Sequence, residues 1–242
     1  MNKHVPRIVA AVAIFCLLTV GCTTHDSSKP IRAQDYRETI RVACVGDSIT
    51  YGDSIQHRLR DCYPAQLGRM LGQKWETRNF GVSGATMLKN GDRPYWKQKA
   101  FKDALAFNPH VVIIKLGTND TKPQNWKFRD EFVPDYADMI DRFADSPVNP
   151  RIWICYPVPA YPERWGISDS RIRNQVIPLI SEVARRKRAP VIDLYGPLSN
   201  RPELFPDLIH PNAEGARFIA EEIYTALTGL QLAERKQEPA LP

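Results

Sequence analysis

The chain has 242 residues, 43% of them hydrophobic and 25% charged, which is the composition of a globular protein with a sizeable core. Its net charge of +6 is a small excess of interspersed charges, so we expect no nucleic-acid partner. The densest basic run, residues 184–190, falls where a helix should end, and cations there complement the helix dipole.

The N-terminal segment has the pattern of an export signal. Basic residues precede an apolar run at 8–20, which is short for a membrane span and suits a signal peptide. The following LTVGC resembles a bacterial lipobox, which implies cleavage before Cys22 and lipidation of that cysteine. We therefore expect a lipoprotein-type signal peptide at 1–21, a flexible tether at 22–36, and export to the cell envelope with a lipid anchor as the membrane contact. A periplasmic or secreted protein without lipid and an uncleaved anchor helix are the alternatives.

The remaining cysteines indicate neither a disulfide framework nor a metal site. Cys44 and Cys155 fall in apolar strand patterns, where cysteine is usually a small buried hydrophobe. No two of Cys44, Cys62 and Cys155 have the sequence spacing of metal ligands, so we expect no bound metal.

Apolar runs alternate with helical patterns along the rest of the chain. Strands are expected at residues 40–45, 77–80, 111–116, 152–155 and 191–194. Helices are expected near residues 64–71, 96–107, 131–143, 169–188 and 212–227. Pro178 interrupts the fourth helix, and Asn212 can cap the last one. This alternation predicts one α/β domain at 37–230, with a parallel, doubly wound sheet covered by helices on both faces, and a disordered tail at 231–242.

Four short polar segments, most of them bearing glycine, lie after predicted strands or before the last helix. Ligands of parallel α/β sheets bind at the carboxyl ends of the strands, so we expect these segments to meet on one rim. The segments are GDS at 46–48, NFGVSGAT at 79–86, GTND at 117–120 and DLIHPN at 207–212.

Ser48 is the candidate nucleophile, and a serine needs a base to act as one. Of the five histidines, His210 is the best placed, because it lies in the last of these segments. Asp207 precedes it by three residues and can hold one imidazole nitrogen while the other points at the serine. Asp193, at the end of the fifth predicted strand, is the rival for this acid role.

Donors for a developing oxyanion come from the middle segments. They are the backbone N–H of Ser48, the N–H of Gly84 and the side-chain amide of Asn119. Either Gly84 or Asn119 alone would indicate a turn. Together with the serine and the Asp-x-x-His pattern they indicate acyl transfer.

The segments GDSIT, NFGVSGAT, GTND and DLIHPN resemble, in this order, the four sequence blocks of the SGNH or GDSL-type hydrolases. The resemblance extends over about residues 40–227. It implies a flavodoxin-like three-layer α/β/α fold with a five-stranded parallel sheet, and ester hydrolysis without a metal or other cofactor. It implies the same roles for Ser48, Asp207, His210, Gly84 and Asn119.

Aromatic residues in the loops after the strands suggest a sugar as part of the substrate. We select Trp126 and Tyr156 as substrate-binding candidates, and Tyr161 and Trp165 lie in the same loops. Each aromatic taken alone would more often be a packing residue. The segment KLGTNDTKPQNW is similar to bacterial sialate-type and other carbohydrate O-acetylesterases, so we predict removal of acetyl groups from carbohydrate.

Two other functions fit the same sequence. A lysophospholipase or thioesterase would share every catalytic residue and differ in the length of the acyl chain. A non-catalytic glycan-binding lipoprotein would use the same aromatic residues without needing an acid beside His210.

Overall fold

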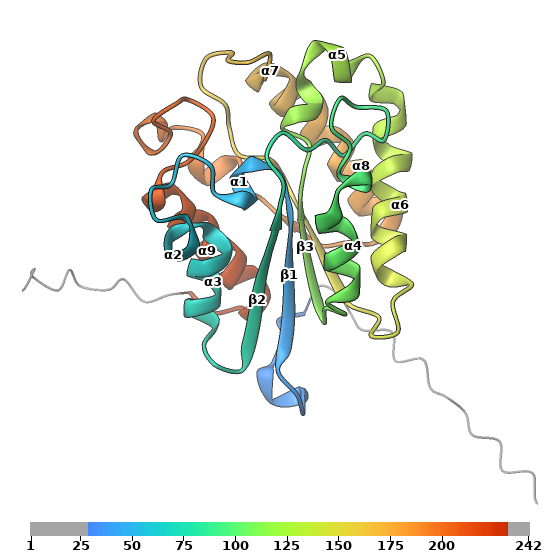
Figure 1. The fold of residues 1–242 in the computed structure, drawn as a ribbon, viewed down its shortest axis with the longest axis vertical. Coiled ribbons are helices and arrows are strands. Elements are labelled where there is room, and N and C mark those ends of the chain that lie inside the picture. The colour runs from blue at the N-terminus through green and yellow to red at the C-terminus, as the bar shows by residue number, and fades with distance from the viewer. Residues whose placement is uncertain (1–28, 232–242) are drawn as a thin grey trace, which may run out of the picture.

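The computed structural model describes residues 29–231. Five parallel strands form one sheet in the order β2-β1-β3-β4-β5, with helices on both faces (Figure 1). The strands are β1 (Ile40–Gly46), β2 (Trp75–Gly81), β3 (Val111–Lys115), β4 (Arg151–Cys155) and β5 (Val191–Ile192). This is the flavodoxin-like strand order, so the predicted three-layer α/β/α fold is confirmed. The predicted signal peptide, Cys22 and nearly all of the predicted tail lie outside the described residues.

The sheet is apolar on both sides because helices cover both sides. Along β1, Val42 and Cys44 enter one hydrophobic cluster, whereas Ala43 and Val45 enter the other. Successive side chains of a strand point to opposite faces, so one apolar run supplies both cores.

Each face of the sheet has its own helices (Figure 1). The helices α3 and α9 contribute to the cluster that holds Val42, and α4, α6 and α8 contribute to the cluster that holds Val45. Their bounds are α3 (Tyr63–Leu71), α4 (Lys99–Ala106), α6 (Phe132–Ala144), α8 (Ile177–Lys187) and α9 (Ala213–Thr228). Shorter helices are α1 (Ser48–Tyr51), α2 (Arg58–Asp61), α5 (Pro123–Trp126) and α7 (Asp169–Arg171). The side chain of Asn212 caps α9 as expected, by accepting from the N–H of Gly215 at 2.9 Å.

Three expected elements differ in the structure. The helix expected at 96–107 is a 3-10 turn at Tyr95–Lys97 followed by α4. The helix expected at 169–188 is α7, then a π-helical turn at Ile172–Val176, then α8. Pro178 lies in the first turn of α8, and the wider turn before it accommodates a residue that cannot donate a backbone hydrogen bond. Strand β5 stops at Ile192 because the side chain of Asp193 accepts from the N–H groups of Tyr195 and Gly196 and starts a turn.

The second part of the predicted tether packs against the domain. Ile31 is 5% exposed, and its N–H donates to the carbonyl of Leu227 near the end of α9 at 2.6 Å. A short 3-10 turn follows at Ala33–Asp35. The folded unit therefore begins before residue 37, because Ile31 has an apolar site to fill at the amino end of the sheet.

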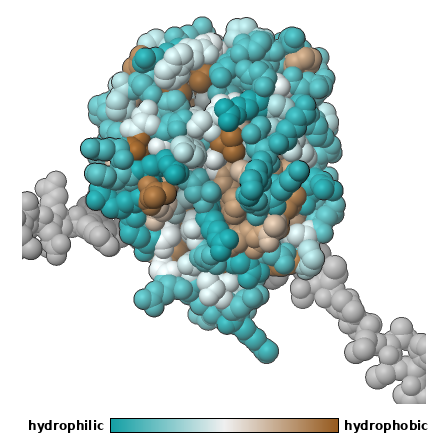
Figure 2. Space-filling model, in the orientation of Figure 1, coloured by the Kyte–Doolittle hydropathy of each residue, from teal (hydrophilic) through white to brown (hydrophobic). Residues whose placement is uncertain are grey.

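Hydrophilic side chains predominate on the face shown in Figure 2. The apolar residues on this face form small patches, and the broadest of them lies below the level of α1. Within residues 29–231, no helix has both the length and the apolar character needed to cross a membrane.

Candidate active site

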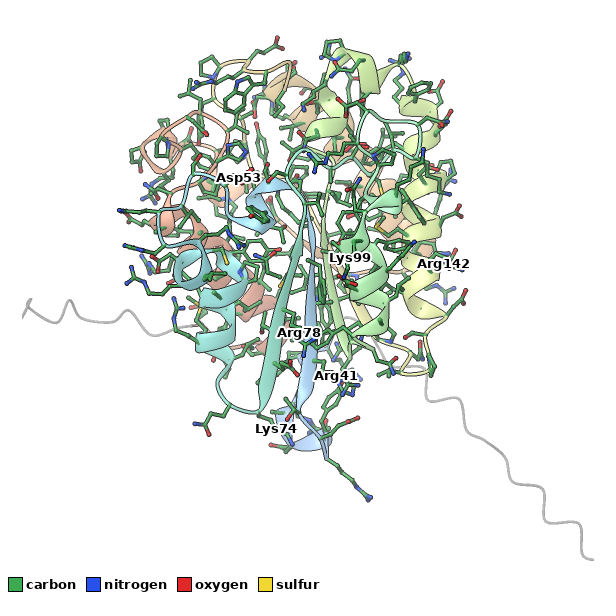
Figure 3. The ribbon with its side chains drawn as sticks, viewed as in Figure 1. Arg41, Asp53, Lys74, Arg78, Lys99 and Arg142 are labelled. Carbon is green, nitrogen blue, oxygen red and sulfur yellow. The ribbon has the colours of Figure 1, made fainter. Side chains whose placement is uncertain are left out.

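Ser48 lies on a sharp turn between β1 and α1, at the carboxyl end of the sheet. The side chain of Asp47 caps α1 by accepting from the N–H of Ile49 at 3.0 Å, so Ser48 is the first helical residue. A Cβ atom at Gly46 would lie 2.1 Å from Thr50 Oγ1, so α1 can approach the strand this closely only with glycine at that position. Figure 3 marks this end of β1 by Asp53, just after α1, and the opposite end by Arg41.

The structure brings Ser48, His210 and Asp207 into one chain of hydrogen bonds. His210 Nε2 lies 2.9 Å from Ser48 Oγ, and His210 Nδ1 lies 2.7 Å from Asp207 Oδ2. The serine hydroxyl and the histidine are 162 positions apart in the sequence, and the turn before α9 closes that distance. This arrangement can move a proton from the hydroxyl to the imidazole while the carboxylate holds the other nitrogen.

Besides the histidine ring, three other donors hold the carboxylate of Asp207. Its Oδ1 accepts from the backbone N–H groups of Ile209 at 3.0 Å and His210 at 2.7 Å. Its Oδ2 also accepts from the hydroxyl of Ser54 at 2.9 Å. Burial raises the pKa of Asp207, but the backbone and ring hydrogen bonds from His210 outweigh this and lower it to about 2. The group is therefore an anion at neutral pH.

Ser54 was not among the expected site residues. It lies in the loop after α1 with φ of 67°, and its bond to Asp207 spans 153 positions. No local pattern in the sequence signals this bond, because it depends on how the two loops meet. The rival acid Asp193 is occupied elsewhere, since its Oδ1 accepts from two backbone N–H groups of its own turn.

Gly84 and Asn119 lie in neighbouring loops that a hydrogen bond connects. Asn119 is 3% exposed, and its Nδ2 donates to the carbonyl of Ala85 at 3.1 Å. The amide keeps a second hydrogen for another acceptor. Gly84 has φ of 76°, and a Cβ atom there would meet only the Arg93 side chain at 3.5 Å. The backbone conformation, rather than lack of space, therefore requires glycine at 84.

Asp120 fixes the loop that follows β2. Its two carboxylate oxygens accept from the N–H groups of Met87 at 3.0 Å and Leu88 at 2.8 Å. The side chain is fully buried, and burial raises its pKa to about 7 against the lowering effect of those two bonds. The end of β3 thus holds the loop that carries Gly84.

Known proteins resemble this chain in sequence and in fold. The sequence matches the GDSL-like Lipase/Acylhydrolase family over residues 44–218. The chain belongs to this family.

A curated relative and two solved structures show how far the likeness extends. This chain is 43% identical, over 208 residues, to an acetylxylan esterase from Xylanibacter ruminicola. The matched region covers 78% of this chain and 43% of that protein. The chain thus spans less than half the length of this relative. A lipase/acylhydrolase from Enterococcus faecalis superposes with a TM-score of 0.66 at 22% identity, covering 78% of this chain and 96% of that one. A carbohydrate acetylesterase from Sinorhizobium meliloti superposes with a TM-score of 0.60 at 18% identity, covering 76% of this chain and 96% of that one. These two structures support the fold.

A buried ion pair lies beside the turn that carries Ser48. Lys115 Nζ is 3.1 Å from Asp47 Oδ1 and 3.2 Å from Oδ2, and it also donates to Thr118 Oγ1 at 3.2 Å. Both charged side chains are fully buried. The pair connects the end of β3 to the residue that caps α1, so it joins the strand that leads to Asn119 to the turn that carries Ser48.

The two aromatic residues selected for substrate binding have other partners. Trp126 is 7% exposed, and its Nε1 donates to Gln175 Oε1 at 2.6 Å. It lines an open depression of about 600 Å³ beside α6 and α8, whose lining includes none of Ser48, Asp207 and His210. The hydroxyl of Tyr156 lies 2.7 Å from Ser181 Oγ on α8. These contacts give both side chains a packing role, and their contact with substrate stays a prediction.

Trp165, which lies in the same group of loops, is the exposed aromatic residue beside the histidine. It is 55% exposed, and its ring centroid is 5.7 Å from that of His210. Its φ of 53° is left-handed, which costs a non-glycine residue about 1–2 kcal/mol. Only the folded loop reveals this feature, because exposure depends on which aromatic residues find packing partners.

The described part of the chain has no candidate metal site. Among residues 29–231, no three histidine, cysteine, aspartate or glutamate side chains are arranged to hold a metal ion.

Proposed function

We propose that this chain is a serine ester hydrolase that removes acetyl groups from carbohydrate. The relay of hydrogen bonds from Ser48 through His210 to Asp207 carries this proposal, with distances of 2.9 and 2.7 Å. Membership of the GDSL-like family supports an acyl hydrolase. The likeness to an acetylxylan esterase supports acetate as the acyl group and a xylan-type sugar as the alcohol.

Acylation begins when His210 accepts the proton of Ser48 and the serine oxygen attacks the ester carbonyl. Asp207, an anion at neutral pH, holds Nδ1–H of the ring and stabilises the imidazolium that forms. The carbon–oxygen bond to the alcohol then breaks, and the alcohol leaves with the proton from His210. His210 then accepts a proton from water, which attacks the carbonyl of the acyl-enzyme. The bond to Ser48 breaks, the serine takes the proton back, and acetate is released.

The tetrahedral intermediates carry a negative oxygen that needs donors. In this proposal the backbone N–H groups of Ser48 and Gly84 and the second amide hydrogen of Asn119 supply them. Their loops are held in place by the bonds from Asn119 to Ala85 and from the Met87 and Leu88 N–H groups to Asp120. Donors fixed in this way need little reorganisation as charge develops, which is the main source of such stabilisation.

Release of acetate from acetylated xylan by the purified protein tests the proposal. Ser48→Ala should lower kcat by about 10⁴–10⁶-fold, because the base then has no nucleophile to activate. Ser170→Ala is the matched control, since Ser170 is exposed and accepts from Asn174 on its own helical segment. Equal acetate release by wild type and Ser48→Ala would refute the mechanism.

A series of p-nitrophenyl esters separates the proposed acetylesterase from a lysophospholipase or thioesterase. Acetate should be the best acyl group, and a preference for long acyl chains would refute the substrate class. Failure of Ser48 to react with a fluorophosphonate would instead favour a glycan-binding protein without catalysis.

A further inference from the structure

We propose that Trp165 forms the binding surface for the alcohol part of the ester, a sugar ring, on the His210 side of Ser48. This inference rests on the proposed function, because it assigns one half of the substrate to one side of the same site. It makes Trp165 the residue that selects the alcohol, whereas the carbonyl oxygen of the ester lies toward Gly84 and Asn119.

The first support is the position of the indole ring. Its centroid is 5.7 Å from that of His210, with 41° between the two planes. The residue is 55% exposed, although the Arg164 guanidinium lies 4.6 Å from the ring centroid. One face of the ring thus has a protein neighbour, and much of the ring is open to a ligand that reaches His210.

The second support is the conformation of the turn. Trp165 and Gly166 have φ of 53° and 76°, and the N–H of Ile167 donates to the carbonyl of Arg164 at 2.9 Å. Positive φ at both central residues is the pattern of a type I′ turn, whose first central position favours asparagine, aspartate or glycine. A tryptophan there is strained, and strained residues persist at ligand sites where the surrounding structure holds them.

The turn is held against the loop of the triad by its other residues. Arg164 donates from Nη1 to the carbonyl of Asp207 at 3.0 Å. Ile167 is buried in a small cluster with Ile209, which directly precedes His210. A Cβ atom at Gly166 would lie 3.2 Å from Pro123, so the turn also packs on the start of α5. The ring is therefore positioned before substrate arrives, and binding orders no loop.

The reaction decides which half of the ester lies against this ring. His210 accepts the proton of Ser48 and then gives it to the leaving oxygen, so the alcohol must lie on the Nε2 side of the imidazole. A sugar ring attached to that oxygen is within reach of an indole 5.7 Å from the histidine. The acyl methyl group has no such requirement, because the oxyanion donors fix the carbonyl from the other side.

The chemistry of the turn suits a sugar. One face of a pyranose presents C–H groups, which pack on an aromatic ring, and its edge presents hydroxyl groups. Beside the indole, the Arg164 guanidinium has donors that its single bond to Asp207 does not use. A planar apolar surface with donors at its edge thus matches a carbohydrate better than a flexible aliphatic alcohol.

Two acetate esters that differ only in the alcohol test this assignment. Vinyl acetate has an alcohol part too small to cover the indole, whereas an acetylated methyl xyloside places a sugar ring there. Both form the same acetyl-enzyme on Ser48, so any difference between them arises before the alcohol has left. The variant is Trp165→Asn, because asparagine tolerates the left-handed conformation and preserves the turn.

We expect Trp165→Asn to lower kcat/KM for the xyloside by about tenfold or more and to leave that for vinyl acetate within about twofold. Trp165→Phe, which keeps a ring, should retain the xyloside activity within about threefold. Leu59→Ala is the control for loss of an exposed apolar side chain, since Leu59 is exposed on α2.

Equal losses for both esters would overturn the assignment, because the ring would then act only by positioning His210. No loss for either ester would also overturn it. Wild-type protein that hydrolyses vinyl acetate and not the xyloside would refute the sugar class, whereas wild-type protein that hydrolyses neither would refute the esterase proposal itself.

Discussion

Replacement of Lys115 by methionine should destabilise the protein strongly. The ammonium group is fully buried between β3 and the turn that carries Ser48, 3.1 and 3.2 Å from the two oxygens of Asp47. Methionine fills a similar volume without a charge. The carboxylate of Asp47 then stays buried without its cation, and its remaining partner is the N–H of Ile49 at 3.0 Å.

The size of the effect follows from the burial of both groups. Removal of one partner of a buried ion pair costs about 3–5 kcal/mol, mostly because the other charge is left uncompensated. In Lys115→Met, Asp47 loses the ammonium group that contacts both of its oxygens and keeps one neutral donor. We therefore expect a destabilisation within this range. For a domain of this size the melting temperature should fall by about 6–20 °C, at about 2–4 °C for each kcal/mol.

Urea unfolding of four proteins measures the effect: wild type, Lys115→Met, Asp47→Asn and the double variant. The double variant should be more stable than Lys115→Met, because the asparagine amide oxygen can still accept from Ile49 and no charge is left unpaired. A loss below about 1 kcal/mol for Lys115→Met would refute the reasoning, as would a double variant less stable than either single one.

Three further results should follow from the same structure. Asp207→Asn should lower kcat by about 10³–10⁴-fold through loss of the carboxylate that orients His210, whereas Asp193→Asn should change it by less than about threefold; the reverse order would make Asp193 the acid. Burial raises the pKa of Asp120 to about 7, so between about pH 4 and 7 the folded protein keeps a proton that the unfolded chain has lost. The free energy of unfolding should therefore fall as the pH rises through this window, and urea titrations at several pH values should show a flatter dependence for Asp120→Asn; identical slopes would contradict the shift. Trp165→Gly should be about 1 kcal/mol more stable than Trp165→Ala, because φ is 53° there, and equal midpoints in urea would show that the turn carries no strain.

The fold was predictable because each strand and each main helix carries a local signal. The apolar run of β3 and the proline near the start of α3 mark those elements in the sequence, and Asn212 marks the start of α9. The boundaries that differ are set by contacts between distant residues or by turns. The π-helical turn before Pro178 and the early end of β5 at Asp193 are two such cases.

The candidate site was predictable as far as its residues lie in short polar segments. Ser48 and His210 end on the same rim because parallel strands place their carboxyl ends together. Ser54 could not be found in this way, since its bond to Asp207 joins two loops that carry no common pattern. The choice among the loop aromatics also depends on packing, because Trp126 meets Gln175 in the fold whereas Trp165 stays exposed.

The contact between Ile31 and the end of α9 places the start of the described chain beside its end. Lys29 also reaches the amino end of β4, where its carbonyl accepts from the Arg151 side chain, so both ends of the described chain meet at the pole opposite Ser48. A support grafted at either end of the described chain would therefore leave Ser48 on the side away from the support. Protein immobilised on a bead through its amino end should deacetylate an insoluble polymer as readily as a soluble one, with no need for a long spacer.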